Sequence, residues 1–107
     1  MSGFSLEDLE LIVASRVAAD SGQSYTRQLL DKGVEHCAKK FGEEAFEVAL
    51  AAVADDPKAT AGEAADVLYH LMVLLRAASV PLAEVMAVLE GRTGQSGLAE
   101  KAARAKD

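Results

Sequence analysis

The sequence has one cysteine, Cys37, no tryptophan and two prolines, and only 5% of its 107 residues are aromatic. A lone cysteine excludes an internal disulfide and a cysteine-rich zinc site. Few aromatic residues and abundant alanine disfavour a β-sandwich, because alanine is the best helix former and a weak strand former. The composition therefore predicts an all-α fold.

Basic residues are also scarce. The sequence has 11 Lys and Arg residues and 17 Asp and Glu residues, which gives a net charge of -6. A nucleic-acid surface needs a basic patch that replaces phosphate counterions, so we expect no nucleic-acid partner. The chain lacks an apolar run of about 20 residues, which a membrane span requires. Glu7, Asp8 and Glu10 stand where a secretory signal would be basic. We expect a cytoplasmic protein without a membrane partner.

The length suits one small domain with one core, so we expect a single domain over residues 1–107. Its core is expected over about residues 5–92, followed by a charged, loose tail over 93–107. Cys37 lies at helical spacing from Val34 and Phe41. This spacing predicts that Cys37 is a small buried hydrophobic residue rather than a reactive thiol.

Local signals predict a bundle of four to five helices. Ser5 with Asp8 three residues later resembles a capping box, and Ser24 is a second candidate cap. Asp55-Asp56-Pro57 ends a long helix, because the residue before proline avoids the α region. The expected helices cover residues 6–19, 25–32, 34 to about 54, 59–78 and 81–89, with Gly33 interrupting the second and third and Gly91 just past the last.

Two pairs of acids stand on successive predicted helices. Glu44 and Glu47 form the first pair, and Glu63 and Asp66 form the second. Residues three apart share a helix face, so each pair projects two carboxylates in one direction. In an antiparallel hairpin Asp66 lies level with Glu47, and the other two acids fall within roughly one turn of that level. The spacing predicts that the four carboxylates converge, with the face that carries Glu63 and Asp66 turned inward.

Several acids in one bundle repel one another, and their desolvation is costly unless a cation or proton is supplied. Mg²⁺ prefers oxygen ligands and keeps positions open for water and substrate phosphates. We therefore expect Glu44, Glu47, Glu63 and Asp66 to bind Mg²⁺, with Mn²⁺ as an alternative. Glu43 points further toward solvent, so it is a candidate outer-sphere group or base. A carboxylate that the metal does not fully engage can accept the proton, and the two candidates for this general base are Glu43 and Glu47.

Cationic residues precede the acids and can hold phosphate oxygens that the metal does not. The candidates for substrate binding are Arg27, Lys32, Lys39 and Lys40. The alternative for each lysine is a solvated helix face. His70 follows Asp66 by one turn, and it is either a satisfied histidine of the bundle or a contact for the metal ligands or substrate.

These acids carry a family resemblance. Glu43-Glu44-x-x-Glu47 with Glu63-x-x-Asp66 resembles the E-E-x-x-E and E-x-x-D signature of the all-α nucleotide pyrophosphohydrolases, the MazG-like superfamily. Within it, the chain is most similar to the phosphoribosyl-ATP pyrophosphohydrolase family over about residues 5–92. The segments that carry this closer similarity are Ser24–Gly33, Lys39–Glu44 and Asp66–Leu71.

The resemblance implies Mg²⁺-dependent hydrolysis of a small nucleotide, phosphoribosyl-ATP, to phosphoribosyl-AMP and pyrophosphate, the second step of histidine biosynthesis. It implies Glu44, Glu47, Glu63 and Asp66 as metal ligands, in agreement with the spacing. It also implies a homodimer in which helices of both copies complete the MazG-like bundle.

Two alternatives remain at this point, and a third is disfavoured by the histidine spacing. A house-cleaning pyrophosphohydrolase that acts on free or damaged nucleotides would use the same acids. A non-enzymatic helical dimerisation module would carry them on its surface. A di-iron bundle normally needs Glu-x-x-His twice, and neither His36 nor His70 follows a glutamate at that spacing. The number of metal ions and the identity of the base stay open.

Overall fold

Five α-helices follow one another in the structure, a computed structural model that describes residues 3–18, 22, 24–94, 101 and 104. They are α1 (Leu6–Val17), α2 (Tyr25–Asp31), α3 (Val34–Val53), α4 (Pro57–Ala77) and α5 (Leu82–Thr93). The described residues contain no strand, so the all-α prediction is confirmed. Most of the predicted tail over 93–107 lies outside the described residues.

The first two helices begin at the predicted caps. Ser5 Oγ accepts a hydrogen bond of 3.1 Å from Asp8 N, and Asp8 Oδ2 accepts one of 3.0 Å from Ser5 N. This reciprocal pair is a capping box. At α2, Ser24 Oγ accepts a hydrogen bond of 3.1 Å from Arg27 N. Both caps satisfy N–H groups that the first turn of a helix leaves without a partner.

Two turns set the lengths of the long helices. Gly33 has a φ of 94°, which glycine adopts readily, and it separates α2 from α3 as predicted. Asp56 Oδ1 accepts a hydrogen bond of 3.0 Å from Ala59 N and caps α4. The helix therefore begins at Pro57, two residues before the predicted Ala59. Proline is tolerated there because the first helical N–H has no intrahelical partner.

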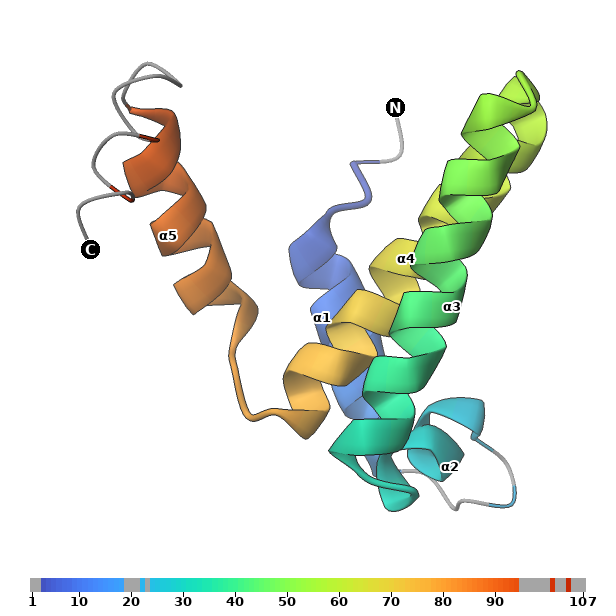
Figure 1. Cartoon of the computed structure of the whole chain (residues 1–107). Helices are drawn as coiled ribbons and strands as arrows, with labels where there is room; N and C mark the ends of the chain where they lie inside the picture. The colour runs from blue at the N-terminus through green and yellow to red at the C-terminus, as the bar shows by residue number, and fades with distance from the viewer. Residues whose placement is uncertain (1–2, 19–21, 23, 95–100, 102–103, 105–107) are drawn as a thin grey trace.

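The helices α3 and α4 lie side by side as an antiparallel hairpin, and α1 and α2 pack against the end of it that holds the start of α3 (Figure 1). The buried core joins these elements through apolar side chains of all five helices. Its members are Val13, Leu29, Cys37, Met72, Val73 and Leu82. Cys37 is 1% exposed, which confirms its prediction as a buried residue, and burial raises the pKa of its thiol.

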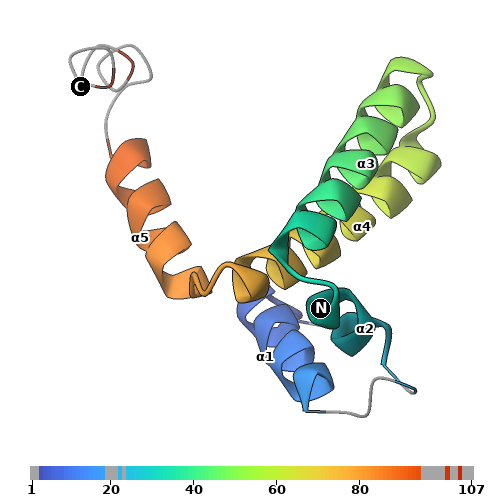
Figure 2. The ribbon, with the colours of Figure 1, turned by 60° about the horizontal axis from the view of Figure 1, so that its bottom comes forward.

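The last helix, α5, projects away from the hairpin (Figure 2). The chain bends by 113° between α4 and α5. The helix continues to Thr93, so the prediction that it ends at Leu89 with Gly91 beyond it was wrong. Gly91 lies inside a regular helix, where glycine costs only about 1 kcal/mol relative to alanine. No single described helix is long and apolar enough to cross a bilayer, and the bent pair α4 and α5 passes only by combined length and composition.

One face of the hairpin is apolar and exposed. Phe46, Leu50 and Val53 on α3 are 65%, 53% and 86% exposed. The radius of gyration is 16.1 Å, whereas a compact chain of this length has about 13 Å. A single copy therefore exposes a contiguous apolar stripe on α3.

Candidate metal centre

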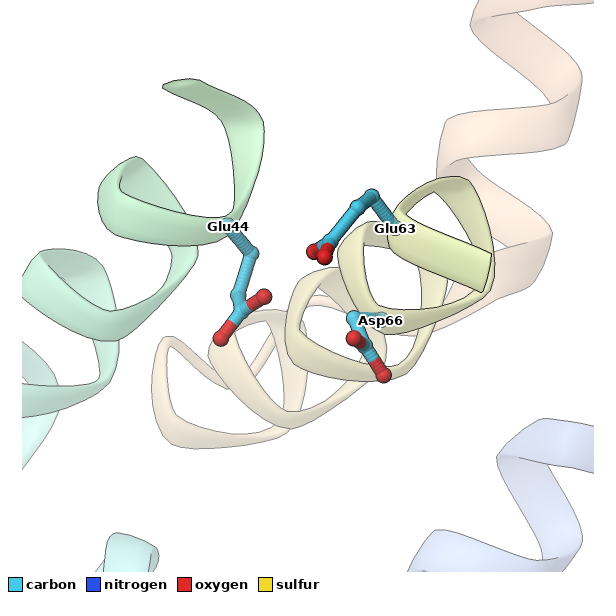
Figure 3. A group of neighbouring side chains, drawn as sticks. All are labelled: Glu44, Glu63 and Asp66. Carbon is cyan, nitrogen blue, oxygen red and sulfur yellow. The ribbon is translucent and has the colours of Figure 1, made fainter. Parts of the chain in front are cut away.

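Three carboxylates converge across the α3–α4 hairpin. Glu44 on α3 points toward Glu63 and Asp66 on α4 (Figure 3). Each offers one oxygen, and these oxygens all lie within 4.8 Å of one another. The turn at Asp55 and Asp56 brings the two acidic segments to the same level, as the spacing predicted.

Glu63 is the most constrained acid of the group. Its Oε2 atom is buried and has no hydrogen-bond partner among the described residues. Desolvation raises the pKa of Glu63, and the neighbouring carboxylates of Glu47, Asp66 and Glu44 raise it further. A buried carboxylate oxygen without a partner is costly, and a hard divalent cation would remove that cost. The donor set therefore fits Mg²⁺ or Mn²⁺.

Glu47 lies at the side of this group. Its side chain is exposed and does not belong to the three oxygens that converge. It is nevertheless close to Glu63, since its carboxylate is among the groups that raise the pKa of Glu63. Three residues along a helix leave Glu47 rotated by about 60° from Glu44. The structure thus brings three of the four predicted ligands together and places the fourth beside them.

Glu43 has a different partner. Lys40 Nζ lies 3.1 Å from Glu43 Oε2, one turn earlier on α3. The hydrogen bond and charge of Lys40 lower the pKa of Glu43, and Glu43 in turn raises the pKa of Lys40. A carboxylate with a lowered pKa is a weaker proton acceptor. The pairing with Lys40 therefore disfavours Glu43 as the general base.

His70 is buried beside the acids, with only 7% of its surface exposed. Its Nε2 atom lies 4.0 Å from Glu44 Oε1, which is too long for a direct hydrogen bond. The rings of Tyr25 and Tyr69 contact it edge to face, with centroids 6.0 Å and 5.6 Å away. His70 is thus packed in the bundle and also adjacent to a predicted metal ligand.

The predicted phosphate-binding cations lie in different settings. Arg27 Nε pairs with Asp31 Oδ1 at 3.0 Å, and Arg27 Nη1 donates to the carbonyl oxygen of Val17 at 3.0 Å, so its side chain links α2 to α1. Lys32 and Lys39 are exposed. Lys40 lies nearest to the acids through its pair with Glu43. These placements do not assign any of the four to a substrate.

A hydrogen-bonded group next to His70 was not predicted from the sequence. The hydroxyl groups of Thr26 and Tyr69 share a hydrogen bond, and Arg16 Nη1 donates to Tyr69 Oη at 3.3 Å. Thr26 is 0% exposed. The contacts tie α1, α2 and α4 together beside the carboxylates. The available signal was Tyr69, which follows Asp66 by three residues and therefore shares its helix face.

A helical hairpin with converging carboxylates, a buried oxygen without a partner and a nearby lysine defines an all-α protein with a candidate divalent-metal centre. Comparison with known proteins narrows this class. The family described as "Phosphoribosyl-ATP pyrophosphohydrolase" matches residues 6–93. The chain therefore belongs to this family, which confirms the resemblance and the expected enzyme class, a hydrolase.

Relatives named phosphoribosyl-ATP pyrophosphatase cover nearly the whole chain. The protein of Agrobacterium fabrum is 58% identical over 104 residues, 97% of each chain. That of Azorhizobium caulinodans is 61% identical over 94% of this chain and 92% of the relative. "Phosphoribosyl-ATP pyrophosphatase 1" of Rhodopseudomonas palustris is 53% identical over 100% of both chains.

Proposed function

We propose that this chain hydrolyses phosphoribosyl-ATP to phosphoribosyl-AMP and pyrophosphate, the second step of histidine biosynthesis, in the cytoplasm. The observation that carries the proposal is the convergence of Glu44, Glu63 and Asp66, together with a buried Glu63 oxygen that has no hydrogen-bond partner in the described part of the chain. Family membership supports the substrate.

The proposed ligands of Mg²⁺, or of Mn²⁺ in its place, are Glu44, Glu47, Glu63 and Asp66. When bound there, the ion would offset charge that develops on the phosphate oxygens and lower the pKa of the attacking water. The lysine pair Lys39 and Lys40 would contact the remaining phosphate oxygens, since both stand one to two turns before the acids on α3.

The reaction moves one proton and breaks one anhydride bond. Water attacks the α or the β phosphorus, and the bond from the attacked phosphorus to the oxygen that bridges the two breaks. Attack at the α phosphorus expels pyrophosphate, whereas attack at the β phosphorus expels phosphoribosyl-AMP and leaves the water oxygen in pyrophosphate. Glu47 accepts the proton that the attacking water loses. Its side chain is exposed at the edge of the cluster, whereas Glu43 is held by Lys40.

The exposed face of α3 supports a homodimer. Phe46, Leu50 and Val53 recur at steps of four and three residues, so they form one stripe along the helix. All three side chains are at least half exposed, and a contiguous exposed apolar stripe, unlike a single exposed apolar residue, marks an interaction surface. We propose that a second copy of the chain covers this stripe and completes the bundle.

The substrate test compares pyrophosphate release from phosphoribosyl-ATP, ATP and a modified nucleoside triphosphate, each with Mg²⁺. The proposal expects phosphoribosyl-ATP to be turned over with the highest kcat/KM. Equal or faster turnover of ATP would favour the house-cleaning alternative and overturn the substrate assignment. A dimerisation module would release no pyrophosphate from any of the three.

A further inference from the structure

Tyr25 is exposed although its neighbours in sequence are anchored. Its surface is 52% exposed, whereas Ser24 and Thr26 on either side are 6% and 0% exposed. Ser24 Oγ accepts from Arg27 N and donates to the carbonyl oxygen of Arg16, both at 3.1 Å. The hydroxyl group of Thr26 shares a hydrogen bond with the hydroxyl group of Tyr69. Hydrogen bonds therefore fix the residues on both sides of Tyr25, and Tyr25 is exposed between two anchored neighbours.

The ring of Tyr25 lies next to the metal centre. Its centroid is 6.0 Å from the His70 ring, and His70 Nε2 is 4.0 Å from Glu44 Oε1. One buried imidazole therefore separates Tyr25 from a carboxylate of the converging group. In a nucleotide, one ribose separates the base from the phosphates. If the phosphates are held near Glu44, the base lies about the length of one side chain from them, and the ring of Tyr25 lies at that distance.

The charge around Tyr25 also suits a nucleotide. Lys40 is close enough for Tyr25 to influence its ionisation, after the larger effect of Glu43. An exposed aromatic face next to a cation is the combination that proteins use to bind a base and its phosphate together. Phe46 is also exposed, but among the described residues the ring contacts of His70 are with Tyr25 and Tyr69.

We infer that Tyr25 is a stacking platform for the purine base of the nucleotide substrate, and that it contributes to the recognition of a nucleotide over a simple polyphosphate. The inference deepens the proposed function and rests on it for the identity of the base. Tyr25 is placed as a binding residue, and it takes no part in bond breaking.

The test measures binding to two ligands by calorimetry in the presence of Mg²⁺. One is an ATP analogue with a methylene group between the α and β phosphorus atoms, which resists hydrolysis. The other is inorganic tripolyphosphate, which has no base. In Tyr25→Ala the nucleotide is expected to bind about tenfold more weakly, because base stacking on an aromatic side chain has that order of effect. Tripolyphosphate should bind as to the wild type, and Tyr25→Phe should retain both affinities.

Equal losses for both ligands would show that Tyr25 only supports His70 and Glu44, and would overturn the inference. So would an unchanged affinity for the nucleotide. The outcome is separable from the proposed function. If the wild type binds the analogue through Tyr25 but releases no pyrophosphate from phosphoribosyl-ATP, the substrate assignment fails while the platform stands.

Discussion

The carboxylate of Glu10 on α1 accepts a hydrogen bond of 2.8 Å from the backbone N–H of Leu82, the first residue of α5. No side chain within α5 caps this end of the helix. Glu10 therefore supplies the missing acceptor from the other end of the chain, and its charge favours the helix N-terminus. Because Leu82 is also buried, this contact sets where α5 leaves the bundle.

Replacing Glu10 by alanine removes this cap. We expect Glu10→Ala to lower the free energy of unfolding by about 1–2 kcal/mol, the usual cost of losing a charged helix cap. Urea denaturation followed by circular dichroism measures the change. Glu90→Ala is the matched control, since Glu90 is exposed on α5. A surface substitution of this kind costs no more than about 0.5 kcal/mol. Equal losses in the two variants would argue against a capping role.

Neutral substitutions test the acids as ligands. We expect Glu47→Gln and Asp66→Asn each to reduce turnover of phosphoribosyl-ATP at least about 100-fold, because even groups that only orient metal ligands contribute 10–100-fold. The melting temperature in chelator should stay the same or rise, since each change relieves repulsion between like charges.

Glu35→Gln provides the control for these variants, because Glu35 is exposed in the first turn of the same helix as Glu47. It should keep wild-type turnover. A large loss in Glu35→Gln, or an unfolded Asp66→Asn, would show that the activity assay reports on folding and not on metal binding.

The raised pKa of Glu63 predicts a dependence of stability on pH in metal-free protein. The folded state holds the Glu63 proton more tightly than the unfolded chain does. Its stabilising contribution is fully present below the ordinary value of 4.5 and is lost as the pH rises through the raised pKa. In the presence of chelator, the melting temperature of the wild type should therefore fall relative to that of Glu63→Gln as the pH rises from 4.5 through the raised pKa. The glutamine side chain does not titrate in this range. Parallel curves for the two proteins would contradict this.

The apolar stripe on α3 predicts that two copies of the chain form a dimer through this face. We expect the wild type to be a dimer by light scattering, and Leu50→Glu to shift it toward monomer, because a charge in a buried apolar contact is costly. Leu50→Met keeps the apolar character and should remain dimeric. A Leu50→Glu protein with the mass of the wild type would place the dimer contact elsewhere.

Local signals in the sequence were sufficient for most of the helices. Each of Ser5, Asp8, Ser24 and Gly33 acts on backbone within three or four residues of its own position, so its role can be predicted from spacing. Glu44, Glu63 and Asp66 lie at the same height along the hairpin, and this could be predicted from the position of the turn between α3 and α4. The end of α5 was predicted wrongly because glycine is typical of the position just past a helix end, whereas the backbone of Gly91 remains helical.

Contacts between distant segments could not be predicted in this way. The cap from Glu10 to Leu82 joins residues 72 apart, and the bond between Thr26 and Tyr69 joins residues 43 apart. Neither pairing has a periodic signature. The displacement of Glu47 from the other acids depends on how far α3 is rotated against α4, which is set by packing of the whole hairpin.

The central claim is that the carboxylates between α3 and α4 hold a divalent cation for hydrolysis of phosphoribosyl-ATP. The most direct measurement is pyrophosphate release from phosphoribosyl-ATP by purified protein in Mg²⁺, after removal of the ion with a chelator, and after Mg²⁺ is added back in excess. The account predicts release with Mg²⁺, loss of release in chelator, and recovery when Mg²⁺ returns. Undiminished release in chelator, or no release with Mg²⁺, would contradict it.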